Sequence, residues 1–210
     1  MEHEGQPVGG TEVTQHSGPM PSIAARTGFR PAVIWFTGIP GAGKSTLAVS
    51  VGTRLRARNV PHYVLDADQV RRGLNSDLGF SDAHRNENVR RMAHVAALLA
   101  DAGLVVLVAC IAPFAADRTR SRELIGERYW EVFVDLPQAI AESRDPKGLY
   151  ARARRGELTS FTGVDSDYER PDAPDVRIDT SRFTASEAAE EVMEHLSAWG
   201  ILDPGEAWLR

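Results

Sequence analysis

The clearest chemical motif of the chain is a glycine-rich segment that ends in a lysine and a serine. Residues 38–45 read GIPGAGKS and match the pattern G-x-x-x-x-G-K-[ST] in full. Glycines in such a loop let backbone N–H groups converge on an anion with no Cβ in the way. Lys44 can place its ammonium on the β- and γ-phosphates of a nucleotide, and the Ser45 hydroxyl can ligate Mg²⁺. The segment predicts a site for ATP with Mg²⁺, and the residues expected to bind the nucleotide are Gly38, Gly41, Ala42, Gly43, Lys44, Ser45 and Thr46.

Two aspartates follow a second apolar run, in the sequence LDAD. Asp66 and Asp68 come directly after residues 62–65, which have the pattern of a buried strand. A carboxylate at this place could hold Mg²⁺ through water, or orient and deprotonate an attacking hydroxyl. The alternative is structural, because aspartate also forms turns and caps helices. Since we expect the phosphate loop to follow the adjacent strand, we favour a catalytic role for at least one of the two.

Arginines and one aromatic residue gather after these aspartates. The loop-like residues 73–80 carry Phe80, and Arg85 and Asn88 are three positions apart, so they share a helix face. Guanidinium forks beside an aromatic ring suit an acceptor that has a planar base and an anionic group. The alternative is a solvated basic face. The arginines in question are Arg71, Arg72, Arg85, Arg90 and Arg91.

The elements that must position these residues are short apolar runs alternating with helical patterns. This alternation predicts a parallel sheet covered by helices on both faces, as in the three-layer α/β fold of P-loop NTPases, with one domain over residues 31–210. Ligands in such folds bind beyond the carboxyl ends of the strands. We expect strands at 32–38, 62–65, 104–111, 130–135 and 176–178, and helices at 44–58, 85–101, 115–125, from 137 and at 185–199.

Composition narrows the classes of function. The chain has 210 residues, with 24 Lys and Arg against 29 Asp and Glu, and its net charge of −5 argues against a nucleic-acid partner. One cysteine, Cys110, excludes an intramolecular disulfide and a multi-cysteine zinc site. The longest apolar run, 104–111, is too short to cross a bilayer, and no secretory signal is visible. We therefore expect a cytoplasmic protein with no membrane partner, and a flexible tail over residues 1–30, which are rich in Gly, Pro, Ser and Thr.

In combination, the motifs resemble the adenylylsulfate kinase family over about residues 32–180. The segments that carry the resemblance are GIPGAGKST, LDADQVRRGLNSDLGFS, RNENVRRMAHVAALLADAGLVVLVA, EVFVD and RDPKGLYARARRGELTSFTGVDSDYE. The resemblance implies ATP-dependent phosphorylation of the ribose 3′-hydroxyl of adenosine 5′-phosphosulfate. The products would be 3′-phosphoadenosine 5′-phosphosulfate and ADP.

The resemblance also implies roles for individual residues. Asp68 would lie near the acceptor hydroxyl and the metal, with Asp66 as its partner. Lys147 would lie near the transferring phosphate, in a lid over about residues 144–168. Phe80 and Phe161 would sandwich the acceptor adenine, and relatives of this kind are commonly homodimers. The other substrate-binding residues implied are Arg71, Arg85, Asn88 and Ile111.

Two positions near the expected acceptor depart from the family pattern and keep alternatives open. Cys110 and Ala112 stand where the family often has phenylalanine and serine, so the reaction type is better determined than the acceptor. One alternative is a related P-loop kinase that acts on another nucleotide-like acceptor in a capsule or secondary-metabolite pathway. Another is a catalytically silent nucleotide-binding regulator, which would be expected to lose Lys44 or the aspartates, yet all are present.

Overall fold

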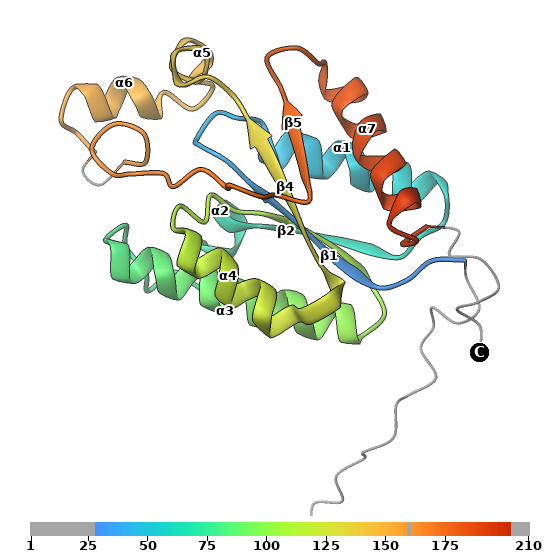
Figure 1. Ribbon diagram of the computed structural model, residues 1–210. Coiled ribbons are helices and arrows are strands. Elements are labelled where there is room, and N and C mark those ends of the chain that lie inside the picture. Colours follow the sequence, from blue (N-terminus) through green and yellow to red (C-terminus); the bar gives the residue numbers. More distant parts are fainter. Residues whose placement is uncertain (1–27, 159–160, 203–210) are drawn as a thin grey trace, which may run out of the picture.

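The computed structural model describes residues 28–158 and 161–202 and contains one parallel sheet (Figure 1). Within these residues the sheet has five strands in the order β2-β3-β1-β4-β5, and each neighbouring pair is parallel. The expected α/β architecture is therefore confirmed. The strands are β1 (Ala32–Thr37), β2 (His62–Asp66), β3 (Val105–Ala109), β4 (Tyr129–Asp135) and β5 (Val176–Asp179).

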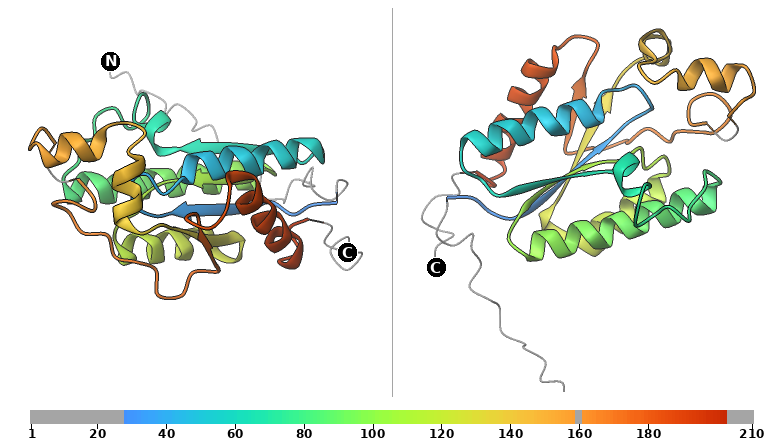
Figure 2. Two further views of the ribbon diagram at one scale, coloured as in Figure 1. Left: turned by 90° about the horizontal axis from the view of Figure 1, so that it is seen from above. Right: turned by 180° about the vertical axis from the view of Figure 1, so that it is seen from behind.

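Helices cover both faces of this sheet, which gives three layers (Figure 2). α1 (Lys44–Ala57) and α7 (Ala185–Ala198) lie on one face, and α3 (Asp82–Asp101) and α4 (Ala115–Ile125) lie on the other. Four shorter helices are α2 (Ala67–Val70), η2 (Gly126–Arg128), α5 (Gln138–Arg144) and α6 (Leu149–Arg154). None of the helices in the described part of the chain has the length and apolar character needed to span a bilayer.

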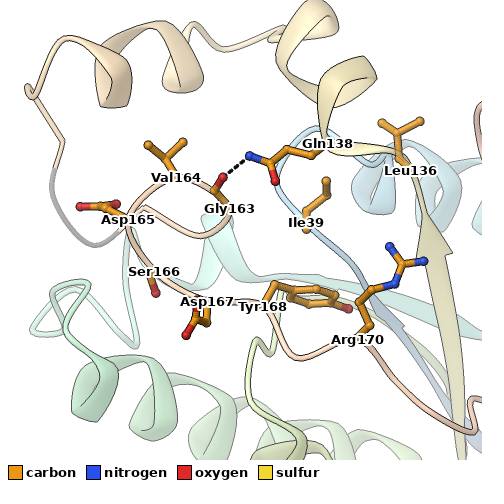
Figure 3. Close-up of a pocket in the computed structure, with 10 residues that line it drawn as sticks. All are labelled: Ile39, Leu136, Gln138, Gly163, Val164, Asp165, Ser166, Asp167, Tyr168 and Arg170. Carbon is orange, nitrogen blue, oxygen red and sulfur yellow. Dashed lines mark hydrogen bonds between the residues drawn. The ribbon is translucent and has the colours of Figure 1, made fainter.

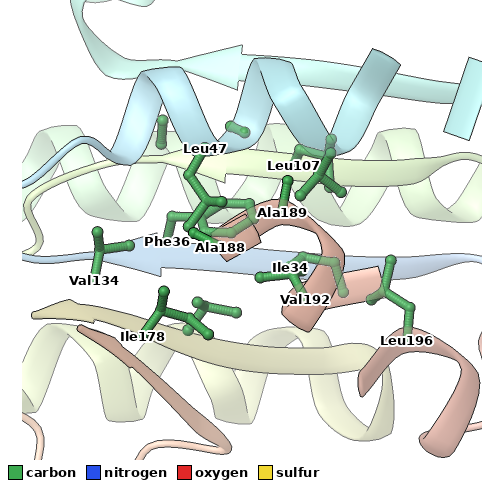
Figure 4. Close-up of a cluster of buried hydrophobic side chains, with 14 of the residues drawn as sticks. Ile34, Phe36, Leu47, Leu107, Val134, Ile178, Ala188, Ala189, Val192 and Leu196 are labelled. Atoms are coloured by element: carbon green, nitrogen blue, oxygen red, sulfur yellow. The ribbon is translucent and has the colours of Figure 1, made fainter. Parts of the chain in front are cut away.

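Alternation along β1 explains why the sheet is buried on both sides. Ile34 and Phe36 face the core beneath α1 and α7, whereas Val33 and Trp35 face the core beneath α3. All four side chains are fully buried, as expected for a central parallel strand whose residues point to opposite faces in turn. Figure 4 shows the first of these clusters, in which side chains of α1 and α7 meet the sheet. The sheet is thus a rigid base for the loops at its carboxyl edge.

The strand neighbours differ from our expectation at one place. β3 lies between β1 and β2, so the strand that ends in Asp66 is not adjacent to the one that enters the phosphate loop. In the register of the sheet, Phe36 and Asp66 both lie opposite Ala109, so both strands end at the same level. Two strand spacings of about 4.8 Å separate them. The aspartates therefore remain at the same edge of the sheet as the phosphate loop.

Two residues at the end of the expected tail contact the domain. Residues 1–27 of the expected tail lie outside the described residues, but Phe29 is fully buried and forms an antiparallel bridge with Leu202. The Arg30 N–H also donates to the Ile201 carbonyl at 2.8 Å. Phe29 and Arg30, at the end of the expected tail, therefore pack on the domain, and the rest of that tail stays a prediction. A single apolar residue among polar ones has no periodicity, so the sequence pattern could not place it in the core.

Candidate active site

The phosphate loop connects β1 to α1, and its first glycine is required by packing against β4. Gly38 has φ +151°, and a Cβ there would lie 2.4 Å from the Val134 carbonyl oxygen, too close for any side chain. Gly41 has φ +79° and lies against the Ala141 carbonyl of α5. Gly43 precedes α1 with φ +99°, and a Cβ there would meet nothing within 4 Å. The loop is therefore held between the carboxyl end of β4 and α5, and the amino end of α1 opens into it.

Lys44 reaches back into this loop from the first residue of α1. Its Nζ donates to the carbonyl oxygens of Gly38 at 2.8 Å and Ile39 at 2.9 Å. Burial lowers the pKa of Lys44 to about 8, although the nearby charges of Asp68 and Asp66 favour the ammonium. The influence of these two carboxylates supports the expectation that the aspartates and the loop face one another across the carboxyl edge. A triphosphate in the loop would bring further negative charge to this ammonium.

The two aspartates at the end of β2 have different contacts. An Asp66 carboxylate oxygen accepts from the Asp68 N–H at 2.8 Å, so Asp66 caps α2, as the structural alternative predicted for this type of residue. The Asp68 carboxylate is more than half exposed and pairs with the Lys147 ammonium. The structure therefore brings together Asp68 and Lys147, two residues separated by 79 positions in the chain. Asp66 thus holds the backbone of Asp68, whose carboxylate is turned to Lys147, and the predicted contact of Asp68 with a substrate stays a prediction.

Arg71 and Phe80 lie together in the segment between α2 and α3. The Arg71 guanidinium lies 4.7 Å from the centre of the Phe80 ring and donates to the Leu78 and Gly79 carbonyls. Phe80 is 59% exposed, which is unusual for phenylalanine, and a second guanidinium, that of Arg85, lies 5.9 Å from the centre of its ring. The structure thus brings the guanidinium and the aromatic ring together, and their use in binding an acceptor stays a prediction.

Arg85 connects this segment to a distant part of the chain. From the first turns of α3 it donates through Nε to the Phe80 carbonyl at 2.9 Å and through Nη1 to the Thr162 hydroxyl at 2.8 Å. Both Arg85 and Thr162 are buried. Thr162 is adjacent to Phe161, so Arg85 ties together the two segments that carry the expected aromatic pair. Thr162 was not among the predicted site residues, although it lies in the segment FTGVDSDYE, because its partner Arg85 is 77 positions away.

Asn88 lies one turn further along α3 and faces the end of β3. Its side-chain oxygen accepts from Asn75 Nδ2 at 3.0 Å, and its Nδ2 lies 3.8 Å from the Cys110 sulfur. Burial raises the pKa of the Cys110 thiol to about 11, so the thiol stays protonated at neutral pH. Cys110, one of the two positions that depart from the family pattern, is therefore buried and contacts the Asn88 side chain.

Ile111 and Ala112 form the turn that follows β3. The Ile111 carbonyl accepts from the Thr37 hydroxyl at 2.6 Å, so this turn is tied to the end of β1. Ala112 is buried and has φ +42°, a left-handed conformation that costs energy for a residue with a Cβ. The Ala112 carbonyl accepts from Arg118 of α4 at 2.8 Å, which helps to hold the turn. Ile111 thus lies at the carboxyl edge, where its predicted contact with substrate remains a prediction.

Phe161 lies on a different part of the site from Phe80. Its ring packs edge-on against Tyr150 of α6, with ring centres 5.0 Å apart and an angle of 83°. Residues 144–158 and 161–168 of the expected lid are described, and Figure 1 shows α5 and α6 beyond the arrowhead of β4. The adenine sandwich between Phe80 and Phe161 and the closing of this segment over phosphates both stay predictions.

A pocket of about 490 Å³ lies next to the phosphate loop, under the segment that follows Phe161 (Figure 3). The Tyr168 hydroxyl, which lines it, shares a 2.9 Å hydrogen bond with the Thr37 hydroxyl and so ties this segment to the end of β1. Burial raises the pKa of Tyr168 to about 12. Sequence reasoning missed Tyr168 and Arg170, although both lie in or next to the segment FTGVDSDYE. The lining residues are Ile39, Leu136, Gln138, Gly163, Val164, Asp165, Ser166, Asp167, Tyr168 and Arg170.

Comparison with known protein sequences gives consistent matches. A family model described as Adenylylsulphate kinase matches residues 30–179. The bifunctional enzyme NodQ of Azospirillum brasilense is 54% identical over 175 residues, which are 83% of this chain but only 28% of NodQ. The adenylyl-sulfate kinase of Aeromonas hydrophila subsp. hydrophila is 47% identical over 189 residues, which are 90% of this chain and 96% of that kinase. The chain therefore spans little more than a quarter of NodQ and nearly all of the Aeromonas kinase.

Comparison with solved structures agrees with the sequence matches. The APS kinase CysC of Mycobacterium tuberculosis, in complex with AMPPNP and APS, superposes with a TM-score of 0.78 and 49% sequence identity. The match covers 80% of this chain and 98% of the CysC chain. The structure compared holds both an ATP analogue and the sulfated nucleotide.

Proposed function

The chain belongs to the adenylylsulfate kinase family, and from this premise we propose that it transfers the γ-phosphoryl group of ATP to the ribose 3′-hydroxyl of adenosine 5′-phosphosulfate. The observation that carries the proposal is that Lys44, in a complete phosphate loop, lies at the same sheet edge as Asp66 and Asp68, whose charges favour its ammonium. A phosphate donor and a hydroxyl acceptor need such opposite charges side by side.

The transfer step makes one bond and breaks one. The 3′-oxygen of the acceptor bonds to the γ-phosphorus, the bond from that phosphorus to the β,γ-bridging oxygen breaks, and ADP leaves. We assign Asp68 to orient the 3′-hydroxyl and accept its proton, since its carboxylate is exposed and Asp66 fixes its backbone. Lys44 and Lys147 offset the negative charge on the transferring group.

The chain also has a residue that could hold Mg²⁺, and we include the ion in the proposal. Ser45 offers a hydroxyl at the start of α1, and Mg²⁺ in kinases commonly takes one or two protein oxygens beside water and phosphate oxygens. When bound, the ion neutralises charge on the phosphate oxygens. The cytoplasmic location and the homodimer implied by the resemblance likewise stay predictions.

The acceptor is tested by measuring ADP release with a coupled assay. We expect rapid turnover with adenosine 5′-phosphosulfate and little with adenosine 5′-phosphate, which lacks the sulfate. A panel of other nucleotides tests the alternative acceptor that Cys110 and Ala112 leave open. Faster turnover with another panel member would replace the proposed acceptor and keep the reaction class. No ADP release with any member, together with intact ATP binding, would favour the silent regulator.

Lys44 sets an expected upper limit to the pH range of the reaction. Because burial lowers its pKa to about 8, the group in the free enzyme is mostly charged below that pH and mostly neutral above it. We expect kcat/KM for ATP to fall as the pH rises through about 8, by about tenfold per further unit. The fall in kcat should begin at higher pH, because bound phosphates favour the ammonium. A profile of kcat/KM that stays level up to about pH 10 would contradict this role for Lys44.

A further inference from the structure

Tyr150 of α6 lies between the phosphate loop and the segment expected to bind the acceptor. Its side chain is buried, and its hydroxyl donates to the Pro40 carbonyl inside the phosphate loop at 3.0 Å. Burial raises the pKa of Tyr150 to about 12, so the hydroxyl remains a donor at neutral pH. Pro40 is 110 positions away in the sequence, so this contact links two separate parts of the fold.

The ring of the same tyrosine supports Phe161. The two rings meet edge to face at 5.0 Å, an arrangement that restricts the orientation of both. Thr162, the next residue, accepts a hydrogen bond from Arg85, which also holds the Phe80 carbonyl. An unbroken line of contacts therefore runs from the phosphate loop through Tyr150 to the residues expected to hold the acceptor.

The first turn of α6, which carries Tyr150, is held by hydrogen bonds from its backbone to Asp145. The Asp145 carboxylate accepts from the Tyr150 N–H at 3.1 Å and the Ala151 N–H at 3.0 Å. These bonds anchor the first turn of α6 two residues after Lys147, which pairs with Asp68. Tyr150 itself is only 3% exposed, and Gly163 lies on the other side of its hydroxyl, where even an added Cβ would fit at 3.6 Å. The hydrogen bond to Pro40 is thus the path by which a displacement of the phosphate loop would reach this buried side chain.

We infer that Tyr150 is a positioning residue that couples the occupancy of the phosphate loop to the placement of Phe161, so that a bound nucleotide changes the affinity for the acceptor. The inference rests on the proposed function, because it takes the acceptor to contact Phe161. By linkage, the acceptor must change the affinity for the nucleotide by the same factor. The physical carrier is the hydrogen bond to Pro40 on one side and the ring contact on the other.

The test measures this coupling directly in the full-length chain. The dissociation constant of adenosine 5′-phosphosulfate is determined by titration calorimetry with and without saturating ADP, which fills the loop without turnover. The ratio of the two constants is the coupling factor. Tyr150→Phe removes the hydroxyl and keeps the ring, and we expect it to change the coupling factor by about 2- to 10-fold toward one, the worth of one hydrogen bond. Affinity for ADP alone should change less.

Two further variants keep the test decisive. Tyr129→Phe removes the hydroxyl of an equally buried tyrosine on the opposite face of the sheet, and its coupling factor should equal that of the wild type. Phe161→Leu removes the ring contact from the other side and should reduce the coupling factor as Tyr150→Phe does. If Tyr150→Phe does not fold, Phe161→Leu alone still tests the inference. In a Phe161→Leu background, Tyr150→Phe should have no further effect on the factor.

Three outcomes would overturn the inference: a wild-type coupling factor of one, an unchanged factor in Tyr150→Phe, or an equal change in Tyr129→Phe. Each of these leaves the proposed function intact as long as the wild type turns over adenosine 5′-phosphosulfate. If the wild type neither binds nor phosphorylates this acceptor, the proposed function fails, and the coupling inference fails with it. The turnover assay and the titration therefore distinguish the two failures.

Discussion

Replacing Lys44 with alanine should abolish phosphoryl transfer, with a loss of at least about a thousandfold in kcat. The ammonium now donates to the Gly38 and Ile39 carbonyls within the loop, close to where backbone amides would cradle the β- and γ-phosphates. Alanine offers no charge there, and water cannot supply a fixed one. Nucleotide binding should weaken much less, because the backbone of the loop and the amino end of α1 remain.

The fold should survive this change, and the experiment must show that it does. A partly buried ammonium whose pKa is lowered by desolvation costs stability, so Lys44→Ala should unfold at the same temperature as the wild type or higher. Arg56→Ala, at an exposed position in the last turn of the same helix, serves as the control and should keep full activity. ADP release is measured for all three proteins beside their thermal unfolding. Wild-type turnover by Lys44→Ala would overturn the assignment of the phosphate loop.

Substituting asparagine for Asp68 should lower kcat by about a hundred- to ten-thousandfold and leave the nucleotide dissociation constant within about threefold of the wild type. Asparagine preserves the shape of the side chain but cannot take a proton from the acceptor hydroxyl. It also removes the charge that pairs with Lys147, which should alter acceptor binding more than ATP binding. Steady-state kinetics give kcat, and titration with ADP gives the nucleotide affinity.

Asp66→Asn is the matched comparison, because the two aspartates are two residues apart and differ in their contacts. Asparagine is as good a helix N-cap as aspartate, so α2 should keep its start and only the charge is lost. We expect a smaller effect on kcat than for Asp68→Asn. The reverse order would assign the proton transfer to Asp66, and an unchanged rate in both variants would assign it to water.

Most of the fold could be predicted because local patterns determine it. The apolar runs of β1 and β3 are short and β-branched, and the phosphate loop has its full spacing. The strand order could not be predicted in the same way, since apolar alternation reports burial but not which strand lies alongside. For this reason the insertion of β3 between β1 and β2 contradicted our expectation, while the common edge of the strands was confirmed.

The site was predictable only as far as its motifs are local. Lys44 and Ser45 follow from spacing, whereas the roles of Asp68 and Lys147 needed a family resemblance. Tyr150, Thr162 and Tyr168 were missed, because their partners lie 110, 77 and 131 positions away. Contacts of this range depend on how the chain returns over the sheet edge, and no repeat or periodicity in the sequence encodes that path.

The glycines of the phosphate loop differ in how strongly the fold itself restricts their replacement during evolution. The first is imposed by the Val134 carbonyl of a neighbouring strand, so a descendant that had lost every use for nucleotides would still be unable to replace it without moving that strand. Gly43 has open space where a methyl group would go, so only its backbone angle resists change. In a relative that keeps this fold but has lost nucleotide binding, we therefore expect the third glycine of the motif to be replaced first and the first glycine last.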